Sequence, residues 1–447
     1  TASDVADYLS KITDTTDTTS LPQSSILNKI ALAVEKSVTA TGDSFAAGRA
    51  FTTTSAGYYL FMTDTDSLSA NEKQTGTSPI FAVVGGNAVV VTEKTSIPTV
   101  TKQVKDDGAD NDWKYKADSQ MGQTVQYKLT GTVASNVDTF STYYYEFHDE
   151  LSAGLTVDKS TVKAVIGETQ ITPTSVTVSD PDSNGRTVLS VWFDDLKAAA
   201  TAAGVTVGEH TRVVVTYSAK LDPNKSQHVV VGGTGNSNTV KLIYSNNPGH
   251  DSRGESVPDT VRDYTYALKL VKKDATDENK ILKGVKFTIR ATDPDDIASK
   301  DMYVQENGSL GTEAYEFTTT DSGEINVKGL DAGTYTVKET HTLAGYNTIP
   351  EFTFTIKAIG FNQAEGEGEN KITVKTSTRG SNLVEVDTTN TDNGTAALIV
   401  KNKQGSGLPL TGLNGVTFTW IAGGAVLCIG VAHLIRSRKQ AEESEQE

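Results

Sequence analysis

The chain has 447 residues and a formal net charge of −16. An excess of negative charge on this scale makes a soluble, self-repelling surface and excludes nucleic acid as a partner. Its single cysteine excludes a disulfide framework, and no HExxH, GxSxG or phosphate-loop motif occurs. We therefore expect about three domains, no metal, no cofactor and no enzyme with turnover.

Residues 1–97 are predicted to form a small mixed α/β domain. Apolar residues recur at helical spacing from Ile26 to Val38, and a shorter helix is expected from Val5 to Ile12. Strand patterns follow at 58–62 and at 80–91, where a Gly-Gly-Asn turn separates two apolar runs.

Residues 98–257 and 258–403 are predicted to form two β-sandwiches in tandem. In the first, strands are expected at 125–129, 213–217 and 240–244, a short helix at 195–203 and a polar linker at 245–258. In the second, strands are expected at 264–271, 285–289, 333–340, 352–356 and 397–400. The predicted fold class is mainly β, with immunoglobulin-like sandwiches.

The second sandwich carries three polar residues at inward-facing strand positions. Lys272, Glu339 and Asn402 each share a strand face with apolar residues two and four positions away, because strand side chains alternate. Three such groups in one core are costly unless they pair or react.

This pattern resembles the CnaB-type domain of Gram-positive pilins and adhesins, in which a glutamate promotes a spontaneous isopeptide bond. The resemblance implies a crosslink between Lys272 and Asn402, with Glu339 as the promoting acid. Burial lowers the pKa of a lysine, so that its neutral amine can attack, and raises that of a carboxylic acid, which can then shuttle protons. Alternatively, Lys272 is a solvated strand-end residue and Glu339 a surface charge.

The first sandwich repeats the pattern, with Lys102 in its first strand, Asp149 in a central strand and Asn246 at its end. It resembles the CnaA-like domain of backbone pilins, where an aspartate takes the part of the glutamate. The resemblance implies a Lys102–Asn246 crosslink promoted by Asp149. Asn238 is a rival acceptor, and Glu146 is a weaker rival acid because it falls on the opposite strand face from Asp149.

Residues 404–447 combine a short motif, an apolar stretch and a basic tail. An expected flexible linker, 404–407, precedes the pentapeptide, and the apolar stretch 416–435 is long enough to cross a bilayer as a helix. The basic residues at 436, 438 and 439 mark the cytoplasmic side. The pentapeptide reads Leu408, Pro409, Leu410, Thr411, Gly412.

This order resembles the cell-wall sorting signal of Gram-positive surface proteins. It implies that a sortase cuts between Thr411 and Gly412 and joins the threonyl carbonyl to an amine. The alternative is an ordinary single-pass anchor. Because an exported protein needs a secretory signal, we expect that the numbering starts after a removed segment.

In shaft pilins the lysine that receives this carbonyl follows the last strand of the N-terminal domain, commonly in a YPKN-like motif. Lys94 occupies the matching place, although Thr92 and Glu93 replace the Tyr-Pro pair. If Lys94 is not the acceptor, Lys36 and Lys73 are the next candidates.

The resemblance implies a major, shaft-forming pilin of a sortase-assembled surface pilus that supports adhesion. Its implied partners are sortase, identical subunits joined head to tail, peptidoglycan, ancillary or tip pilins and host ligands. The expected location is the cell wall, after a membrane-bound precursor stage. The alternative is a wall-anchored adhesin or ancillary pilin that does not polymerise.

Overall fold

The computed structural model describes residues 11, 25–39, 44–46, 48–64, 76–85, 88, 90, 97–105, 112–294, 296–359, 371–377 and 382–405. The chain forms two compact units, one reaching Thr265 and the other starting at Tyr266. Lys94, the pentapeptide 408–412, the apolar stretch 416–435 and, apart from Lys11, the helix expected at 5–12 lie outside the described residues. Within the described ranges, no helix is both long and apolar enough to cross a membrane.

The N-terminal part of the first unit contains one helix and one strand pair. Helix α2 spans Ile26–Ser37, where the hydroxyl of Ser25 accepts a hydrogen bond from the amide of Asn28 and caps the helix start. Strands β1 (Gly57–Phe61) and β2 (Ile80–Val84) pair antiparallel. The mixed α/β character predicted for this segment is confirmed.

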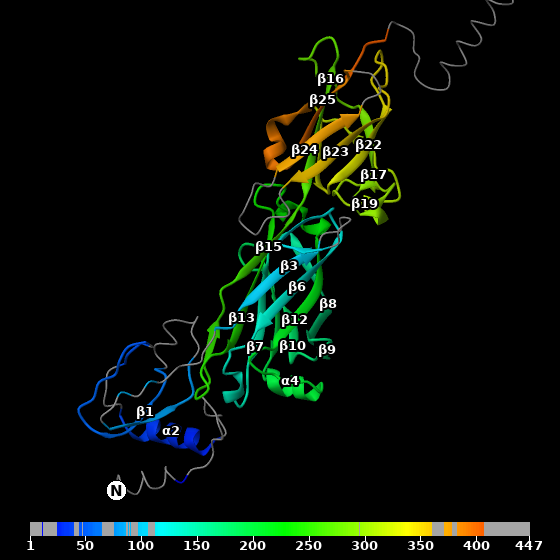
Figure 1. Ribbon diagram of the computed structural model, residues 1–447. Coiled ribbons are helices and arrows are strands. Elements are labelled where there is room, and N and C mark those ends of the chain that lie inside the picture. Colours follow the sequence, from blue (N-terminus) through cyan, green and yellow to red (C-terminus); the bar gives the residue numbers. More distant parts are fainter. Residues whose placement is uncertain are drawn as a thin grey trace, which may run out of the picture. The chain divides into compact units, whose positions relative to one another are not determined.

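The rest of the first unit is a β-sandwich whose two sheets enclose a continuous apolar core. Figure 1 shows β3, β6 and β12 side by side in one of these sheets. Along that sheet the strands are β4 (Trp113–Lys114), β3 (Val100–Lys105), β6 (Thr124–Thr132), β12 (Arg212–Leu221), β8 (Leu155–Ile166) and β9 (Thr169–Ile171). Along the other they are β10 (Ser175–Val178), β11 (Thr187–Phe193), β7 (Tyr145–Leu151), β13 (Asn236–Ser245), β15 (Asp259–Tyr264) and β5 (Lys116–Asp118).

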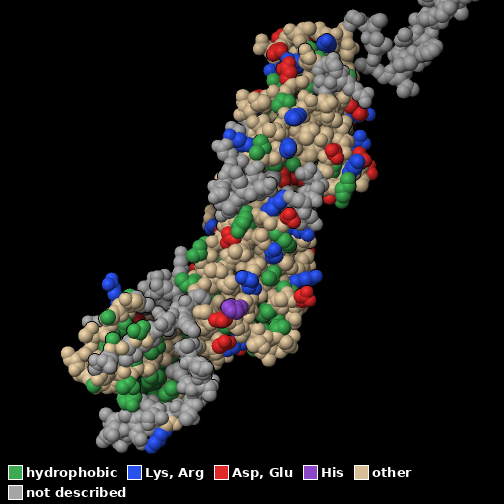
Figure 2. Space-filling view, in the orientation of Figure 1, with side chains coloured by type: hydrophobic (Ala, Val, Ile, Leu, Met, Phe, Trp, Pro, Cys, Tyr) green, Lys and Arg blue, Asp and Glu red, His purple; other side chains and the backbone are tan. Residues whose placement is uncertain are grey.

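Connections in this sandwich include a short helix, α4 (Leu196–Ala202), which confirms the helix predicted there. They also include the 3-10 turns η1 (Val137–Thr139) and η2 (Pro223–His228). On the face drawn in Figure 2, acidic and basic side chains are intermingled rather than segregated by sign.

The segment expected as a linker instead completes the sandwich. Strand β14 (Arg253–Glu255) lies within it and pairs with β13. Strand β15 follows and also pairs with β13, so the boundary expected at residue 258 falls inside the first unit. The strand predicted at 264–271 is therefore divided at Thr265, and its two parts belong to different sheets.

The second unit is a smaller sandwich. One sheet orders its strands as β21 (Glu324–Leu330), β16 (Tyr266–Asp274), β26 (Thr395–Asn402) and β25 (Val384–Asp387), with β16 and β26 parallel. The other orders them as β19 (Leu310–Gly311), β18 (Tyr303–Val304), β17 (Lys286–Pro294), β22 (Gly333–His341), β23 (Phe352–Ile359) and β24 (Lys371–Ser377), and β20 (Phe317–Thr318) pairs with β17. The 3-10 turns are η3 (Ile297–Ser299) and η4 (Thr388–Asn393).

Hydrogen bonds around the buried carboxylate of Asp274 hold the residues that follow β26 to the folded unit. We call this group of contacts the clamp. Asp274 accepts hydrogen bonds from the hydroxyl of Tyr346 at 2.7 Å and from Nε2 of Gln404 at 2.9 Å. The amide of Gly405 donates to the carbonyl of Gly345 at 2.9 Å. The expectation of a free linker from Gln404 onward is therefore wrong for its first two residues, because both are hydrogen-bonded to the folded unit.

The donors around Asp274, first the Tyr346 hydroxyl and then Thr276, hold the pKa of its carboxyl well below the usual range. A depressed carboxyl pKa contributes stability that is present above the unfolded pKa of about 4. That contribution is lost only as the pH falls through the lower folded value. The clamp is thus closed at neutral pH.

Replacing Asp274 with Ala should release the exit segment, because Gln404 and Tyr346 lose their shared acceptor. We expect trypsin to cleave after the exposed Lys403 about tenfold faster at neutral pH than in the wild-type chain. Mass spectrometry of the C-terminal product measures this rate. The control is Asp321→Ala, which removes an exposed acid of the same unit; equal cleavage rates in the two variants would contradict the clamp.

Candidate crosslinking sites

The second unit brings Lys272, Asn402 and Glu339 together in its core. Lys272 lies on β16 and Asn402 on the neighbouring parallel strand β26, where Asp274 is directly opposite Asn402. Glu339 extends from β22 in the facing sheet. Lys272 and Asn402 are fully buried and Glu339 is 4% exposed. The alternative of a solvated Lys272 and a surface Glu339 is excluded by this burial.

The three side chains form a closed set of hydrogen bonds. The amine of Lys272 donates to Oδ1 of Asn402 and, at 3.0 Å, to Oε2 of Glu339. The amide nitrogen of Asn402 donates to Oε1 of Glu339 at 2.7 Å and to the hydroxyl of Thr342 at 2.6 Å. Each carboxylate oxygen of Glu339 therefore faces a different nitrogen.

Burial controls the ionisation of this lysine. Desolvation lowers the pKa of Lys272 to about 8, although the charge of Glu339 and its hydrogen bond oppose the shift. The amine also lies over the ring of Phe287, 5.3 Å from the centroid. A substantial neutral fraction, the nucleophilic form of an amine, is thus available near neutral pH.

This geometry suits condensation of the amine with the amide. The amine of Lys272 is hydrogen-bonded to the carboxamide oxygen of Asn402. The carbon that the amine would attack is bonded to this oxygen. The carboxylate can take a proton from the amine at Oε2 and return one to the departing nitrogen at Oε1. Glu339 contacts the amide nitrogen of Asn402 rather than its carbonyl oxygen. Thr342 was not anticipated, because it lies beyond the end of β22, outside the alternating pattern.

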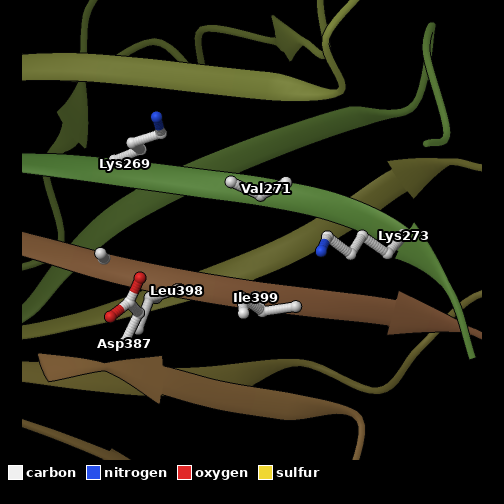
Figure 3. Close-up of a pocket in the computed structure, with 7 residues that line it drawn as sticks. Lys269, Val271, Lys273, Asp387, Leu398 and Ile399 are labelled. Atoms are coloured by element: carbon white, nitrogen blue, oxygen red, sulfur yellow. The ribbon is translucent and has the colours of Figure 1, made fainter. Parts of the chain in front are cut away.

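The opposite face of the β16–β26 pair carries a pocket of about 200 Å³. In Figure 3 the two strands run side by side, with Val271 and Ile399 between the side chains of Lys269 and Lys273. Alternation along β16 places Lys269, Val271 and Lys273 away from the buried Lys272. The pocket is therefore separate from the candidate crosslinking site.

In the first unit, Lys102 on β3 meets Asp149 on β7. The amine donates to the two carboxylate oxygens at 2.5 and 2.6 Å, and both side chains are fully buried. It also donates to the hydroxyl of Tyr217 at 3.1 Å. Since β3 and β7 belong to different sheets, the pair bridges the interior of the sandwich.

The side-chain amide in this cluster is that of Asn238. Its nitrogen donates to the Tyr217 hydroxyl at 2.6 Å, and that hydroxyl donates to Oδ2 of Asp149 at 2.6 Å. Asn238 is fully buried, and its Oδ1 has no hydrogen-bond partner among the described residues. Desolvation lowers the pKa of Lys102 to about 8, against the opposing charge of Asp149.

The structure does not bring the expected acceptor, Asn246, to Lys102. Asp149 pairs with Val240 on β13, and Asn238 is the next residue on the same face of that strand. Asn246 lies beyond the end of β13, about 20 Å from Val240 in an extended chain. Its Oδ1 accepts from the Ser252 hydroxyl at 2.7 Å. The geometry therefore favours the rival, Asn238, because strand register sets which asparagine faces the lysine.

Glu146, the rival acid, is occupied elsewhere. The Tyr144 hydroxyl donates to its Oε2 at 2.5 Å, and Nδ1 of His148 is 3.3 Å from its Oε1. Tyr217 was not foreseen as part of the site, although the alternation of β12 places it on the buried face with Val213 and Val215. A tyrosine at an inward position of a core strand was the signal that could have found it.

Comparison with known proteins supplies a context for this fold. The family model of the SpaA prealbumin-like fold domain matches residues 267–372, most of the second unit. No match is found among curated proteins. Several solved structures of Gram-positive major pilins are similar to the chain.

The T6 backbone pilin of serotype M6 Streptococcus pyogenes is 16% identical, with a TM-score of 0.56 over 87% of this chain and 90% of that one. The full-length major pilin SpaD from Corynebacterium diphtheriae is 19% identical, with a TM-score of 0.46 over 78% and 80%. The pilus backbone RrgB from Streptococcus pneumoniae is 14% identical, with a TM-score of 0.39 over 57% and 92%. The chain thus has the tandem β-domain fold of the T6 backbone pilin, and its second unit contains a SpaA prealbumin-like domain.

Proposed function

We propose that this chain is the major structural subunit of a covalent surface pilus on a Gram-positive cell. The observation that carries the proposal is the buried Lys272–Glu339–Asn402 set, of which Lys272 and Glu339 lie within the match to the SpaA prealbumin-like domain. The likeness to a backbone pilin over most of the chain supports it. The subunit acts as a structural protein and as a substrate of its assembly enzyme, without turnover of its own.

Each sandwich forms one isopeptide bond in this proposal, Lys272 with Asn402 and Lys102 with Asn238. Glu339 and Asp149 are the acids that promote these bonds. The amine nitrogen bonds to the carboxamide carbon, the bond from that carbon to the amide nitrogen breaks, and ammonia leaves. The Lys272–Asn402 bond closes a loop of 130 residues. On the estimate used for disulfides, such a closure stabilises the fold by about 4 to 5 kcal/mol.

Assembly depends on two segments outside the described residues. A sortase cuts between Thr411 and Gly412 and joins Thr411 to Lys94 of the next subunit. Donor and acceptor surfaces differ, so the contact is head to tail and propagates as a filament. The final subunit is attached to peptidoglycan, and ancillary pilins and host ligands are further partners in adhesion.

A second candidate function is a wall-anchored adhesin or ancillary pilin that does not polymerise. The replacement of the usual Tyr-Pro pair by Thr92 and Glu93 before Lys94 favours it. This candidate keeps both crosslinks and the sorting signal, so only polymerisation separates the two.

We expect the recombinant full chain to be lighter than its sequence by two ammonia molecules, one for each crosslink. Glu339→Gln keeps the size of the side chain but cannot take up the proton of the amine, so this variant should lack only one. Intact mass spectrometry measures the deficit of each variant against its own sequence. Glu316→Gln, which alters a half-exposed acid of the same unit, is the control and should lack two. A full deficit in Glu339→Gln would remove Glu339 from the reaction.

The crosslinking rate should rise with pH and level off above about pH 9. Both lysines have a pKa of about 8, and a lysine becomes a neutral nucleophile as the pH rises through its pKa. Unfolded chain from inclusion bodies can be refolded at pH 6 to 10, quenched in acid and weighed over time. An unburied amine would still gain reactivity up to about pH 10.4. A rate that does not change with pH would mean that the amine passes its proton to the acid before it attacks.

Lys94→Ala should abolish the ladder of boiling-resistant multimers while monomer still reaches the wall through Thr411. Removal of 408–412 should abolish both. Immunoblots of wall extracts from a strain that assembles the pilus give both readouts. The matched control is Lys36→Ala, which removes a lysine from the last turn of α2 and should leave the ladder unchanged. A ladder that survives Lys94→Ala would move the acceptor role to Lys36 or Lys73.

A further inference from the structure

The two crosslinking sites differ in how the acid reaches the amide. In the second unit, Glu339 contacts the lysine amine and the amide nitrogen directly. In the first unit, Asp149 has a hydrogen bond to the amine but none to Asn238. The Tyr217 hydroxyl stands between them. It is 2.6 Å from Oδ2 of Asp149, 2.6 Å from the amide nitrogen of Asn238 and 3.1 Å from the amine of Lys102.

Tyr217 is packed into the core of the sandwich in this position. It is fully buried on β12, and its ring stacks on that of Tyr127 with centroids 5.2 Å apart and planes at 14°. The amine of Lys102 lies 5.4 Å from the centroids of both rings. Tyr127 has the same burial, but its hydroxyl has no hydrogen-bond partner among the described residues. Two adjacent tyrosines thus pack beside the lysine amine, and the hydroxyl of Tyr217 is the one hydrogen-bonded to the amine, the carboxylate and the amide.

We propose that Tyr217 is a catalytic residue of the first unit, which relays a proton from Asp149 to the departing nitrogen of Asn238. This inference rests on the proposed crosslink between Lys102 and Asn238. The neutral amine attacks the carboxamide carbon, and the ionised Asp149 takes a proton from the nitrogen that has become positively charged. Asp149 then protonates the Tyr217 oxygen as the hydroxyl gives its own proton to the amide nitrogen.

The bond between the carbon and the amide nitrogen breaks at the end of this sequence, and ammonia leaves. One proton has moved from the lysine nitrogen to the leaving group. Asp149 is again ionised and Tyr217 is again a neutral phenol. The relay therefore needs no outside reactant, and burial favours it because desolvation raises the pKa of Tyr217 well above its ordinary value and keeps the phenol protonated.

The test compares Tyr217→Phe with Tyr127→Phe in the full chain refolded from the unfolded state. Each variant loses one buried hydroxyl and keeps the stacked ring pair. We expect the Lys102–Asn238 crosslink to form at least about 100-fold more slowly in Tyr217→Phe, the scale of a lost general acid–base step, and at the wild-type rate in Tyr127→Phe. Tandem mass spectrometry of the linked peptides follows each crosslink separately, and circular dichroism follows recovery of the fold.

The Lys272–Asn402 crosslink serves as an internal reference reaction, because it should form at the wild-type rate in both variants. A wild-type rate for Lys102–Asn238 in Tyr217→Phe overturns the relay alone. Equal slowing in the two variants also overturns it, since the effect then belongs to packing. If Tyr217→Phe does not refold, Asp149→Asn with Tyr217 intact gives a second reading, because an amide cannot pass on the proton. Crosslinking of that variant at the wild-type rate overturns the relay. A wild-type chain without Lys102–Asn238 overturns both the crosslink and the relay.

Discussion

The buried lysine amine is the constraint on which both sandwiches depend. An ammonium group removed from water costs several kcal/mol, and a paired carboxylate recovers only part of this. Lys102 and Lys272 are fully buried beside an acid and an asparagine. The depressed pKa of each amine expresses this cost. Conversion of the amine to a neutral amide would remove this desolvation cost permanently. The same cost of burying the amine therefore favours the reaction.

The strand arrangement decides what such a bond would hold. In the second unit, β16 begins the sandwich and β26 ends it, and the two are parallel neighbours. Tension on the chain ends of that unit would shear these strands past each other, and the Lys272–Asn402 bond would carry the load. In the first unit, Lys102 and Asn238 belong to opposite sheets, so their bond would tie the sandwich across its core. Strand β15 follows Asn238 in the chain and stays outside this closed loop.

Alternation along single strands was enough to predict most of the inward-facing site residues, because it depends only on local sequence. Lys272, Glu339 and Asn402 were placed in one core, and Lys102 with Asp149 in another, and the structure brings each group together. Register between strands was not predictable in the same way. Asn238 lies on β13 and Asn246 comes one residue after its end, an even number of positions away, so alternation alone does not separate them; the pairing of Val240 with Asp149 does. The division at Thr265 was missed for a similar reason, since one apolar run continues into two sheets.

The two sites show how register also sets the chemistry. Glu339 reaches both nitrogens because Lys272 and Asn402 come from adjacent strands and the longer glutamate approaches from the opposite sheet. Asp149 lies on β7, beside β13, with Val240 directly across from it, so its shorter side chain turns toward the lysine and leaves the amide of Asn238 out of reach. The hydroxyl of Tyr217, from the facing sheet, is hydrogen-bonded to both Asp149 and the amide nitrogen of Asn238. In the proposed relay, the phenol of Tyr217 supplies the link to the amide that the aspartate lacks, whereas Glu339 contacts both nitrogens directly.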